Sequence, residues 1–287
     1  MDQARLGVIG GSGLYAIEGL EDVREVRVRT PFGAPSDRYV LGTLDGVPMI
    51  FLPRHGQGHR IQPSDLNFRA NIWGMKKLGA EWIVGVSAVG SMKETIKPGD
   101  IVAVDQFIDR TRHRPDTFFG DGLVVHVALA EPVCGALREA LIAAAKEAGA
   151  RVHPRGTYLC MEGPQFSTRA ESLLYRSWDV DVIGMTNLQE AKLAREAEIC
   201  YATVALATDY DCWHEAEESV TADGILKVLH QNVAMAKEIV RRLGPRRPMP
   251  RKCACPEALA GAIITDRAKI PAAARKRLDL LVGKYLD

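Results

Sequence analysis

The sequence predicts an α/β fold, in which a central mixed β-sheet is flanked by helices in three layers. Short apolar runs typical of buried strands alternate along the chain with longer segments whose apolar residues recur at helical spacing. The first run, residues 6–9, stops at the glycine-rich turn Gly10-Gly11-Ser12-Gly13. Of the 287 residues, 47% are hydrophobic and 25% charged, enough for a sizeable core.

The expected strands and helices cover most of the chain. Apolar runs bounded by turn residues predict further strands at residues 25–28, 39–44, 47–52, 82–86, 101–104, 157–159, 182–183 and 200–207. Helical periodicity predicts helices at residues 64–78, 131–148, 168–178, 188–197, 221–243 and 271–286. Ser64 and Thr168 are the expected N-caps of the first and third helices, and Gly149 is expected to end the second.

The composition changes once, near the end of the chain. Residues 244–256 hold four prolines and a cluster of arginine and lysine residues, which is typical of a solvated linker. We therefore expect residues 1–244 to form the α/β domain. Residues 245–287 are expected to form a linker and a C-terminal helical extension of the same domain.

Charge and hydropathy argue against several classes of protein. A net charge of +1 gives no electrostatic reason to expect nucleic acid or an anionic membrane as a partner. No apolar run approaches the roughly 18 residues that span a bilayer. The N-terminus continues directly into a strand, without the basic and apolar regions of a secretion signal, so we expect a cytoplasmic protein.

The six cysteines are scattered, and in a reducing cytoplasm we expect them to behave as small apolar residues. Cys253 and Cys255 form the one close pair. This pair lacks a second pair or a nearby histidine at zinc spacing, so we expect no metal site. The sequence leaves open whether the two residues form a disulfide.

Polar side chains follow five of the expected strands, at the position where open α/β sheets bind ligands. In chain order these are Ser12, Arg54 with His55, Ser87 with Ala88, Thr186, and Asp209 with Asp211. The hydroxyls, arginine and histidine are groups that bind an oxyanion. Each residue alone has a structural explanation, such as a salt bridge for Arg54 or a helix cap for Thr186. Five strand ends together favour a ligand site.

Several motifs sharpen this interpretation. They include Thr30-Pro31-Phe32-Gly33, Arg54-His55-Gly56, Glu162-Gly163-Pro164-Gln165-Phe166-Ser167 and Ala207-Thr208-Asp209-Tyr210-Asp211-Cys212-Trp213. With these motifs the chain resembles the trimeric purine nucleoside phosphorylase family over nearly its whole length, and within it the members that act on 5′-methylthioadenosine. The resemblance implies reversible phosphorolysis to adenine and 5-methylthioribose 1-phosphate, in purine and methionine salvage.

The resemblance also implies roles for individual residues. Phosphate, a co-substrate, would be held by Ser12, Arg54, His55, Ser87, the Ala88 backbone and Thr186. Met185 would lie against the ribose and Phe166 against the purine, while His126 would close the sugar end of a neighbouring subunit's site. Ser167 and Ala222 would tune specificity. The resemblance implies a homotrimer or a dimer of trimers, and the reaction needs no metal or other cofactor.

The chemistry of the leaving group gives Asp209 a role independently of the resemblance. Cleavage leaves negative charge near N7 of the purine, and a carboxylic acid can donate a proton there while accepting from a 6-amino group. Asp209 would have to be protonated near neutral pH, through burial or repulsion from Asp211. An asparagine would suit a 6-oxo purine better, so Asp209 favours adenine.

The 5′ end of the nucleoside needs an apolar pocket if it carries a methylthio group. Val220, Ala222, Ile225 and Leu226 could form this pocket, although the same residues could instead be the core face of an amphipathic helix. The small Ala222 leaves room for other 5′ groups, so a broader adenosine or purine nucleoside phosphorylase stays an alternative.

Three less favoured functions remain. A hydrolytic methylthioadenosine nucleosidase would use water and leave the oxyanion-binding residues unexplained. A non-catalytic nucleoside sensor would not need Asp209. A nicotinamide dehydrogenase fits the glycines at residues 11–16, but the acid that such enzymes carry about 20 residues later is lacking.

Overall fold

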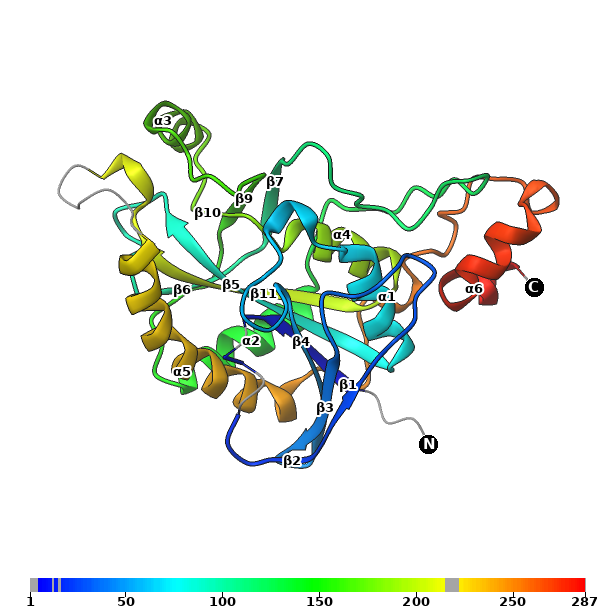
Figure 1. Ribbon diagram of the computed structural model, residues 1–287, viewed down its shortest axis with the longest axis horizontal. Helices are drawn as coiled ribbons and strands as arrows, with labels where there is room; N and C mark the ends of the chain where they lie inside the picture. The colour runs from blue at the N-terminus through cyan, green and yellow to red at the C-terminus, as the bar shows by residue number, and fades with distance from the viewer. Residues whose placement is uncertain (1–4, 12, 15–16, 215–221, 287) are drawn as a thin grey trace.

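A mixed sheet forms the centre of the molecule, as the sequence predicts (Figure 1). The computed structural model describes residues 5–11, 13–14, 17–214 and 222–286, with only the backbone of residues 222–231. Eleven strands lie within these ranges. They are β1 (Arg5–Gly10), β2 (Leu20–Val26), β3 (Tyr39–Leu44), β4 (Val47–Pro53), β5 (Ala80–Ser91), β6 (Ile101–Ala103), β7 (Gln106–Arg110), β8 (Val152–His153), β9 (Thr157–Met161), β10 (Val182–Gly184) and β11 (Cys200–Asp209).

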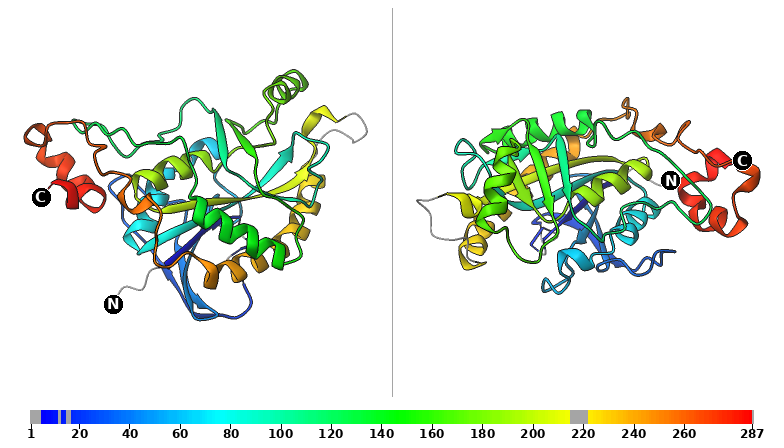
Figure 2. Two further views of the ribbon diagram at one scale, coloured as in Figure 1. Left: turned by 180° about the vertical axis from the view of Figure 1, so that it is seen from behind. Right: turned by 90° about the horizontal axis from the view of Figure 1, so that it is seen from above.

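Helices cover both faces of the sheet and give three layers (Figure 2). They are α1 (Phe68–Lys77), α2 (Gly135–Glu147), α3 (Arg169–Ser177), α4 (Leu188–Glu196), α5 (Ala222–Arg246) and α6 (Ala272–Leu286). Helices α2 and α5 pack in the core cluster on one face, and α1 and α4 in the cluster on the other. Within the described residues, no helix is both long and apolar enough to cross a membrane.

The core follows from the two-residue period of the strands. Trp82, Val84 and Val86 of β5 pack into the cluster with α2 and α5, whereas Ile83 between them packs into the cluster with α1 and α4. All four are almost completely buried. A central strand covered on both faces therefore appears in the sequence as a continuous apolar run.

The strand directions bring distant residues to one edge of the sheet. Strand β1 lies between β4 and β5 and is parallel to both, and β11 is parallel to β5 on its other side. The carboxyl ends of these four strands therefore point the same way. Strand β10 runs antiparallel to β5, with Ile183 opposite Gly90, so its carboxyl end returns along β5.

Several expected boundaries are wrong. The strand expected at residues 25–28 is β2, which spans Leu20–Val26. The helix expected from Ser64 begins at Phe68, with Asn67 as its N-cap, because the Ser64 hydroxyl is instead bound to Glu162 Oε1 at 2.9 Å. The helix expected from residue 131 begins at Gly135. The strand expected at 82–86 continues to Ser91 because β10 and β11 both pair with its second half. Strands β7 and β8 were not expected. The Thr168 cap is confirmed by a capping box with Glu171.

The segment after α5 is only partly solvated, because it alternates exposed residues with residues that pack on the core. Helix α5 itself continues to Arg246, and Cys255 is buried in the core cluster with α2 and α5. Arg247 and Arg251 lie over the ring of Trp82, with their guanidinium carbons 5.4 and 5.9 Å from its centroid. Helix α6 follows and packs Leu278 and Val282 into the opposite cluster.

Candidate active site

Arg54, directly after β4, is buried in the interior of the fold, with 2% of its surface exposed. Its Nε donates to Glu190 Oε1 at 2.5 Å and its Nη2 to Glu190 Oε2 at 3.1 Å. Nη1 donates to the carbonyl oxygen of Val86 and Nη2 to that of Ile9. These four bonds occupy four of the five N–H groups of a guanidinium, so one N–H on Nη1 has no partner among the described residues and could bind an anion.

The carboxylate of Glu190 keeps Arg54 charged in this buried position. Burial alone acts to lower the pKa of Arg54, but the attraction and hydrogen bonding of Glu190 outweigh it and raise that pKa above its usual value. A bidentate contact from Arg54 to phosphate would require the guanidinium to leave one of its present partners. The role of Arg54 in phosphate binding stays a prediction.

A chain of buried hydrogen bonds leads from Glu190 to the hydroxyl of Thr186. The hydroxyl of Tyr201 donates to Glu190 Oε2 at 2.8 Å, and Asn187 Nδ2 donates to the Tyr201 oxygen at 2.7 Å. The Thr186 hydroxyl donates to Asn187 Oδ1 at 3.0 Å. Because each link is buried and has a partner, the network holds the hydroxyl in a fixed place.

Gly85 of β5 makes room for this network. A Cβ atom at this position would lie 2.1 Å from the Tyr201 hydroxyl and 2.3 Å from Asn187 Nδ2. Both distances are far below van der Waals contact. Glycine is therefore required here for a close approach of side chains, even though the backbone conformation would accept other residues.

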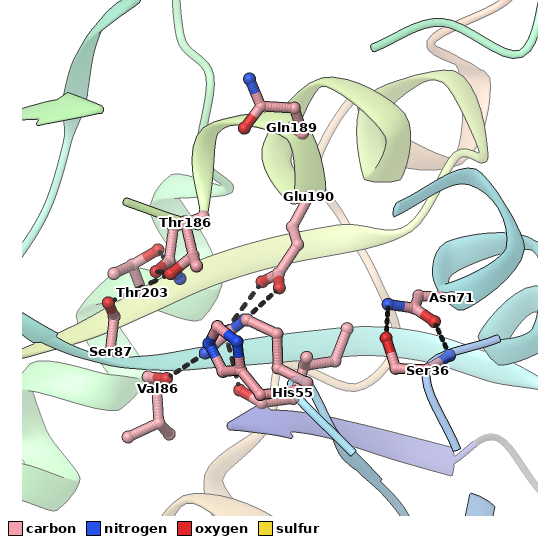
Figure 3. A network of polar contacts seen from close by, with 12 residues as sticks. Ser36, His55, Asn71, Val86, Ser87, Thr186, Gln189, Glu190 and Thr203 are labelled. Carbon is pink, nitrogen blue, oxygen red and sulfur yellow. Dashed lines mark hydrogen bonds and ion pairs between the residues drawn. The ribbon is translucent and has the colours of Figure 1, made fainter. Parts of the chain in front are cut away.

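Ser87 and Thr186 come together as predicted (Figure 3). Their hydroxyl oxygens lie 3.2 Å apart, and both residues are buried. The hydroxyl of Tyr158 lies 3.4 Å from Ser87 Oγ and accepts the backbone N–H of Thr186. Ser87 lies inside β5 rather than after its end, and the antiparallel course of β10 brings Thr186 back to it. Ala88 is the next residue of the same strand.

His55 is held as a neutral ring beside Arg54. Burial, followed by the charge of Arg54, lowers the pKa of His55 to about 4. Its Nδ1 lies 2.8 Å from the carbonyl oxygen of Ile61, and since a carbonyl can only accept, Nδ1 carries the hydrogen. Nε2 is then an acceptor. His55 can thus bind a protonated phosphate oxygen but not an unprotonated one.

The two acids lie together at the carboxyl end of β11. Asp209 pairs with Gly90 after a bulge, and its oxygens accept from the Thr208 hydroxyl and from the backbone N–H of Asp211. The Asp211 carboxylate accepts from the Ser172 hydroxyl. Burial, with a further contribution from the charge of Asp209, raises the pKa of Asp211 above its usual value.

Strand β5 relates the acids to the hydroxyl pair. Ser87 lies beside Thr186, and Gly90, three residues further on, lies opposite Asp209. Three residues of a strand span about 10 Å. That length accommodates a sugar between an anion at the hydroxyls and a base at the acids.

The remaining predicted residues within the described part of the chain lie in two places, around the loop of Gly163 and on the segment of His126. Met185 packs against the loop of Gly163, where a Cβ atom would lie 2.5 Å from its sulfur, and Phe166 of that loop is 51% exposed. Ser167 lies in the same loop, its hydroxyl 3.8 Å from the sulfur of Met161. His126 is exposed on a segment that pairs with the C-terminal extension, at the end of the molecule opposite α3 (Figure 1).

Some predicted residues lie outside what the structure describes. These are Ser12 and the side chains of Ala222 and Ile225, together with Val220 and Leu226 of the expected 5′ pocket. Their roles stay predictions.

Comparison with known proteins identifies the family. The family model of the phosphorylase superfamily matches residues 5–243. This chain belongs to the phosphorylase superfamily. S-methyl-5′-thioadenosine phosphorylases of Geobacter sulfurreducens and Koribacter versatilis are 63% and 58% identical to it. Those alignments cover 98% and 99% of this chain, and 99% and 97% of the two relatives.

Solved structures agree with the fold of this phosphorylase. A methylthioadenosine phosphorylase from an Antarctic soil metagenomic library matches it with a TM-score of 0.93 and 48% identity, over 98% of this chain and 99% of that one. A methylthioadenosine phosphorylase from Schistosoma mansoni in complex with adenine matches with a TM-score of 0.84 and 35% identity, over 91% and 99% of the two chains. The family and the fold class expected from the sequence are confirmed.

Sequence patterns did not indicate the buried residues that support the candidate site. Glu190, Tyr201 and Asn187 were not assigned any role, although all three are buried and polar. One signal was present: Asn187 and Glu190 are three residues apart at the start of a helix, which places both on one face. The partner of Glu190 lies 136 residues away, and no local pattern indicates it.

Proposed function

We propose that this phosphorylase cleaves S-methyl-5′-thioadenosine with inorganic phosphate, giving adenine and 5-methylthioribose 1-phosphate. The observation that carries the proposal is the pair of hydroxyls of Ser87 and Thr186, which lie 3.2 Å apart. Ser87 belongs to β5, and the neighbouring strand β11 ends at Asp209. Relatives of nearly the same length that are 58% and 63% identical carry this activity in their names.

In the proposed reaction, phosphate lies at the hydroxyl pair and attacks the anomeric carbon of the sugar. When phosphate binds, the hydroxyls of Ser87 and Thr186 turn their single hydrogens from their present acceptors, the Ala88 carbonyl oxygen and Asn187 Oδ1, to its unprotonated oxygens. His55 Nε2 accepts from its protonated oxygen. Arg54, held in place by Glu190, supplies a fixed positive charge close to the anion. The phosphate charge in turn stabilises the positive charge that develops on the sugar.

The bond to the purine breaks as the new carbon–oxygen bond forms, and its electron pair passes to the base. Asp209 is the proposed proton donor to N7, with its second oxygen as acceptor for the 6-amino group. Burial, with a further contribution from the charge of Asp209, raises the pKa of Asp211 above its usual value, so this end of the site disfavours two ionised carboxylates. The adenine-bound structure of the Schistosoma mansoni relative supports a site for this base. The proposed reaction uses no cofactor besides the co-substrate phosphate.

The proposed enzyme is a cytoplasmic homotrimer or a dimer of trimers. Helix α3 and the residues on either side of it expose four large apolar side chains, between 41 and 52% each: Phe166, Leu173, Leu174 and Trp178. A cluster of large exposed apolar side chains beside the proposed site supports contact with another subunit. His126, exposed at the opposite end of the molecule, is the proposed contribution to a neighbour's site. Light scattering coupled to size exclusion measures the assembly.

Product analysis with and without phosphate tests the proposed reaction. We expect adenine and a sugar phosphate only when phosphate is present. Free 5-methylthioribose formed without phosphate would identify a nucleosidase, and no adenine in either case would identify a sensor. Parallel reactions with adenosine and inosine measure how far the activity extends to other purine nucleosides.

A matched pair of variants tests the location of phosphate. Ser87→Ala removes a hydrogen bond to a charged group, worth about 1.5–3 kcal/mol, so the KM for phosphate is expected to rise about 10- to 160-fold. Ser91→Ala on the same strand is the control, because the Ser91 hydroxyl is bound to the backbone of Lys93. Equal phosphate KM values in both variants would place phosphate elsewhere.

A further inference from the structure

Four of the six cysteines converge at one place in the fold. The sulfur atoms of Cys134, Cys200, Cys253 and Cys255 all lie within 4.8 Å of one another, and we refer to them as the four-cysteine cluster. All four are free thiols, and the sulfurs of Cys200 and Cys253 are 3.4 Å apart. Three of the residues are buried and Cys253 is half-buried.

Three separate segments bring these cysteines together. Cys134 is the N-cap of α2, and its backbone N–H donates to the carbonyl oxygen of Tyr201. Cys200 is the first residue of β11. Cys253 and Cys255 belong to the segment between α5 and α6. No metal site was expected, because Cys253 and Cys255 have no second pair or histidine near them in the sequence. The fold supplies two more cysteines from distant parts of the chain.

The spacing of the sulfurs suits a tetrahedral metal ion. Zinc–thiolate bonds of about 2.3 Å place the four sulfurs of a tetrahedral site about 3.8 Å apart. A disulfide would require two sulfurs at about 2.05 Å. Cysteines that serve only as small apolar residues have no reason to direct all four sulfurs to one point.

We propose that the four-cysteine cluster binds one zinc ion through four thiolates, as a closed structural site. On binding, each thiol releases its proton to solvent and forms a sulfur–zinc bond, so no oxidant or reductant takes part. Zinc is favoured over harder divalent ions because all four ligands are soft sulfur atoms.

The surroundings favour the negative charge of such a site. Cys134 lies at the N-terminus of α2, a helix of 13 residues, where the helix dipole is positive. Arg195 places Nη1 3.9 Å from the sulfur of Cys255.

The location indicates a structural role. Cys200 and Asp209 lie at opposite ends of β11, which separates the cluster from the proposed site by about 30 Å of strand. With four protein ligands the ion has no open position for a substrate. It would instead join the segment before α6 to the start of β11 and to α2.

Metal analysis of the full-length protein tests the proposal. The protein is purified under reducing conditions without chelator, incubated with Zn²⁺, and freed of unbound metal. We expect about one zinc per chain by elemental analysis, released when the thiols are titrated with an organomercurial. Cys253→Ser and Cys255→Ser are expected to lose most of this zinc. Cys212→Ser is the control and is expected to retain it, because its sulfur lies outside the cluster.

A spectroscopic test on the unaltered chain does not depend on how the variants fold. Co²⁺ bound by four thiolates is expected to give the intense visible bands of a tetrahedral site and a sulfur-to-metal charge-transfer band. Absence of these bands together with less than a tenth of an equivalent of zinc would overturn the proposal. So would an intact mass lower by four hydrogens in protein isolated without oxygen, since that mass shows two disulfides.

Discussion

The ion pair between Arg54 and Glu190 is buried, so each charge depends on the other for its stabilisation. The side chains of Arg54 and Glu190 are only 3% and 1% exposed. Replacing Glu190 by glutamine keeps the shape but removes the charge. One amide oxygen can still accept from Arg54 Nε, while the new NH₂ group would face Nη2, which is itself a donor.

The expected loss of stability is large. Removing one partner of a buried ion pair typically costs about 3–5 kcal/mol, because the other charge remains buried and unpaired. Glutamine retains one hydrogen bond, so we expect the lower end of that range for Glu190→Gln. At about 2–4 °C per kcal/mol, the melting temperature should fall by about 6–12 °C.

Thermal and urea unfolding at a fixed protein concentration measure this change. The control is Glu238→Gln, which removes a surface carboxylate 2.7 Å from Arg242 and should cost less than about 0.5 kcal/mol. The double variant Arg54→Met/Glu190→Met should recover much of the loss, because it leaves no buried charge. A loss below about 1 kcal/mol in Glu190→Gln would refute the reasoning. So would a loss in the double variant equal to the sum of the losses in Arg54→Met and Glu190→Met measured separately.

Three further predictions concern the site. Asp209→Asn should lower kcat/KM for methylthioadenosine relative to methylthioinosine, because an amide can donate to a 6-oxo group; an unchanged ratio contradicts the assignment. Gly85→Ala should cost about 1–3 kcal/mol and raise the phosphate KM by displacing Tyr201, whereas Gly135→Ala, with no atom near its new Cβ, should do neither. His55 should titrate near pH 4 by NMR. Since its pKa is about 6.5 in the unfolded chain, its contribution to stability is present above pH 6.5 and lost between pH 6.5 and 4; equal stability curves for wild type and His55→Gln in that window would contradict this.

Local patterns predicted most of the elements. Continuous apolar runs located β1, β4 and β11, since a strand covered on both faces must be apolar throughout. Thr168 was recognised as a cap because its partner, Glu171, is three residues away. Ser64 fitted the same local rule but was bound by Glu162, 98 residues further along the chain. The difference is whether the deciding contact is local.

The same distinction explains the site. Ser87 and Thr186 were expected to meet because both were predicted to follow strands. They do meet, but Ser87 lies inside β5 and Thr186 reaches it because β10 runs antiparallel to β5. The role of Glu190 could not be predicted, because it depends on a partner 136 residues away. The four-cysteine cluster was missed for the same reason, since only Cys253 and Cys255 are close in sequence.

With phosphate at Ser87 and the purine at Asp209, as proposed above, strand β5 sets the length of substrate that the site accepts. Its second half is hydrogen bonded to neighbours on both sides, and it carries Ser87 at one end and Gly90, opposite Asp209, at the other. Neither end can move relative to the other without breaking the sheet. A nucleoside with a larger ring between its two functional ends would therefore be rejected, however well each end fitted alone. Changes of specificity during evolution must then arise in the surrounding loops, where the chain can adapt without changing this fixed distance.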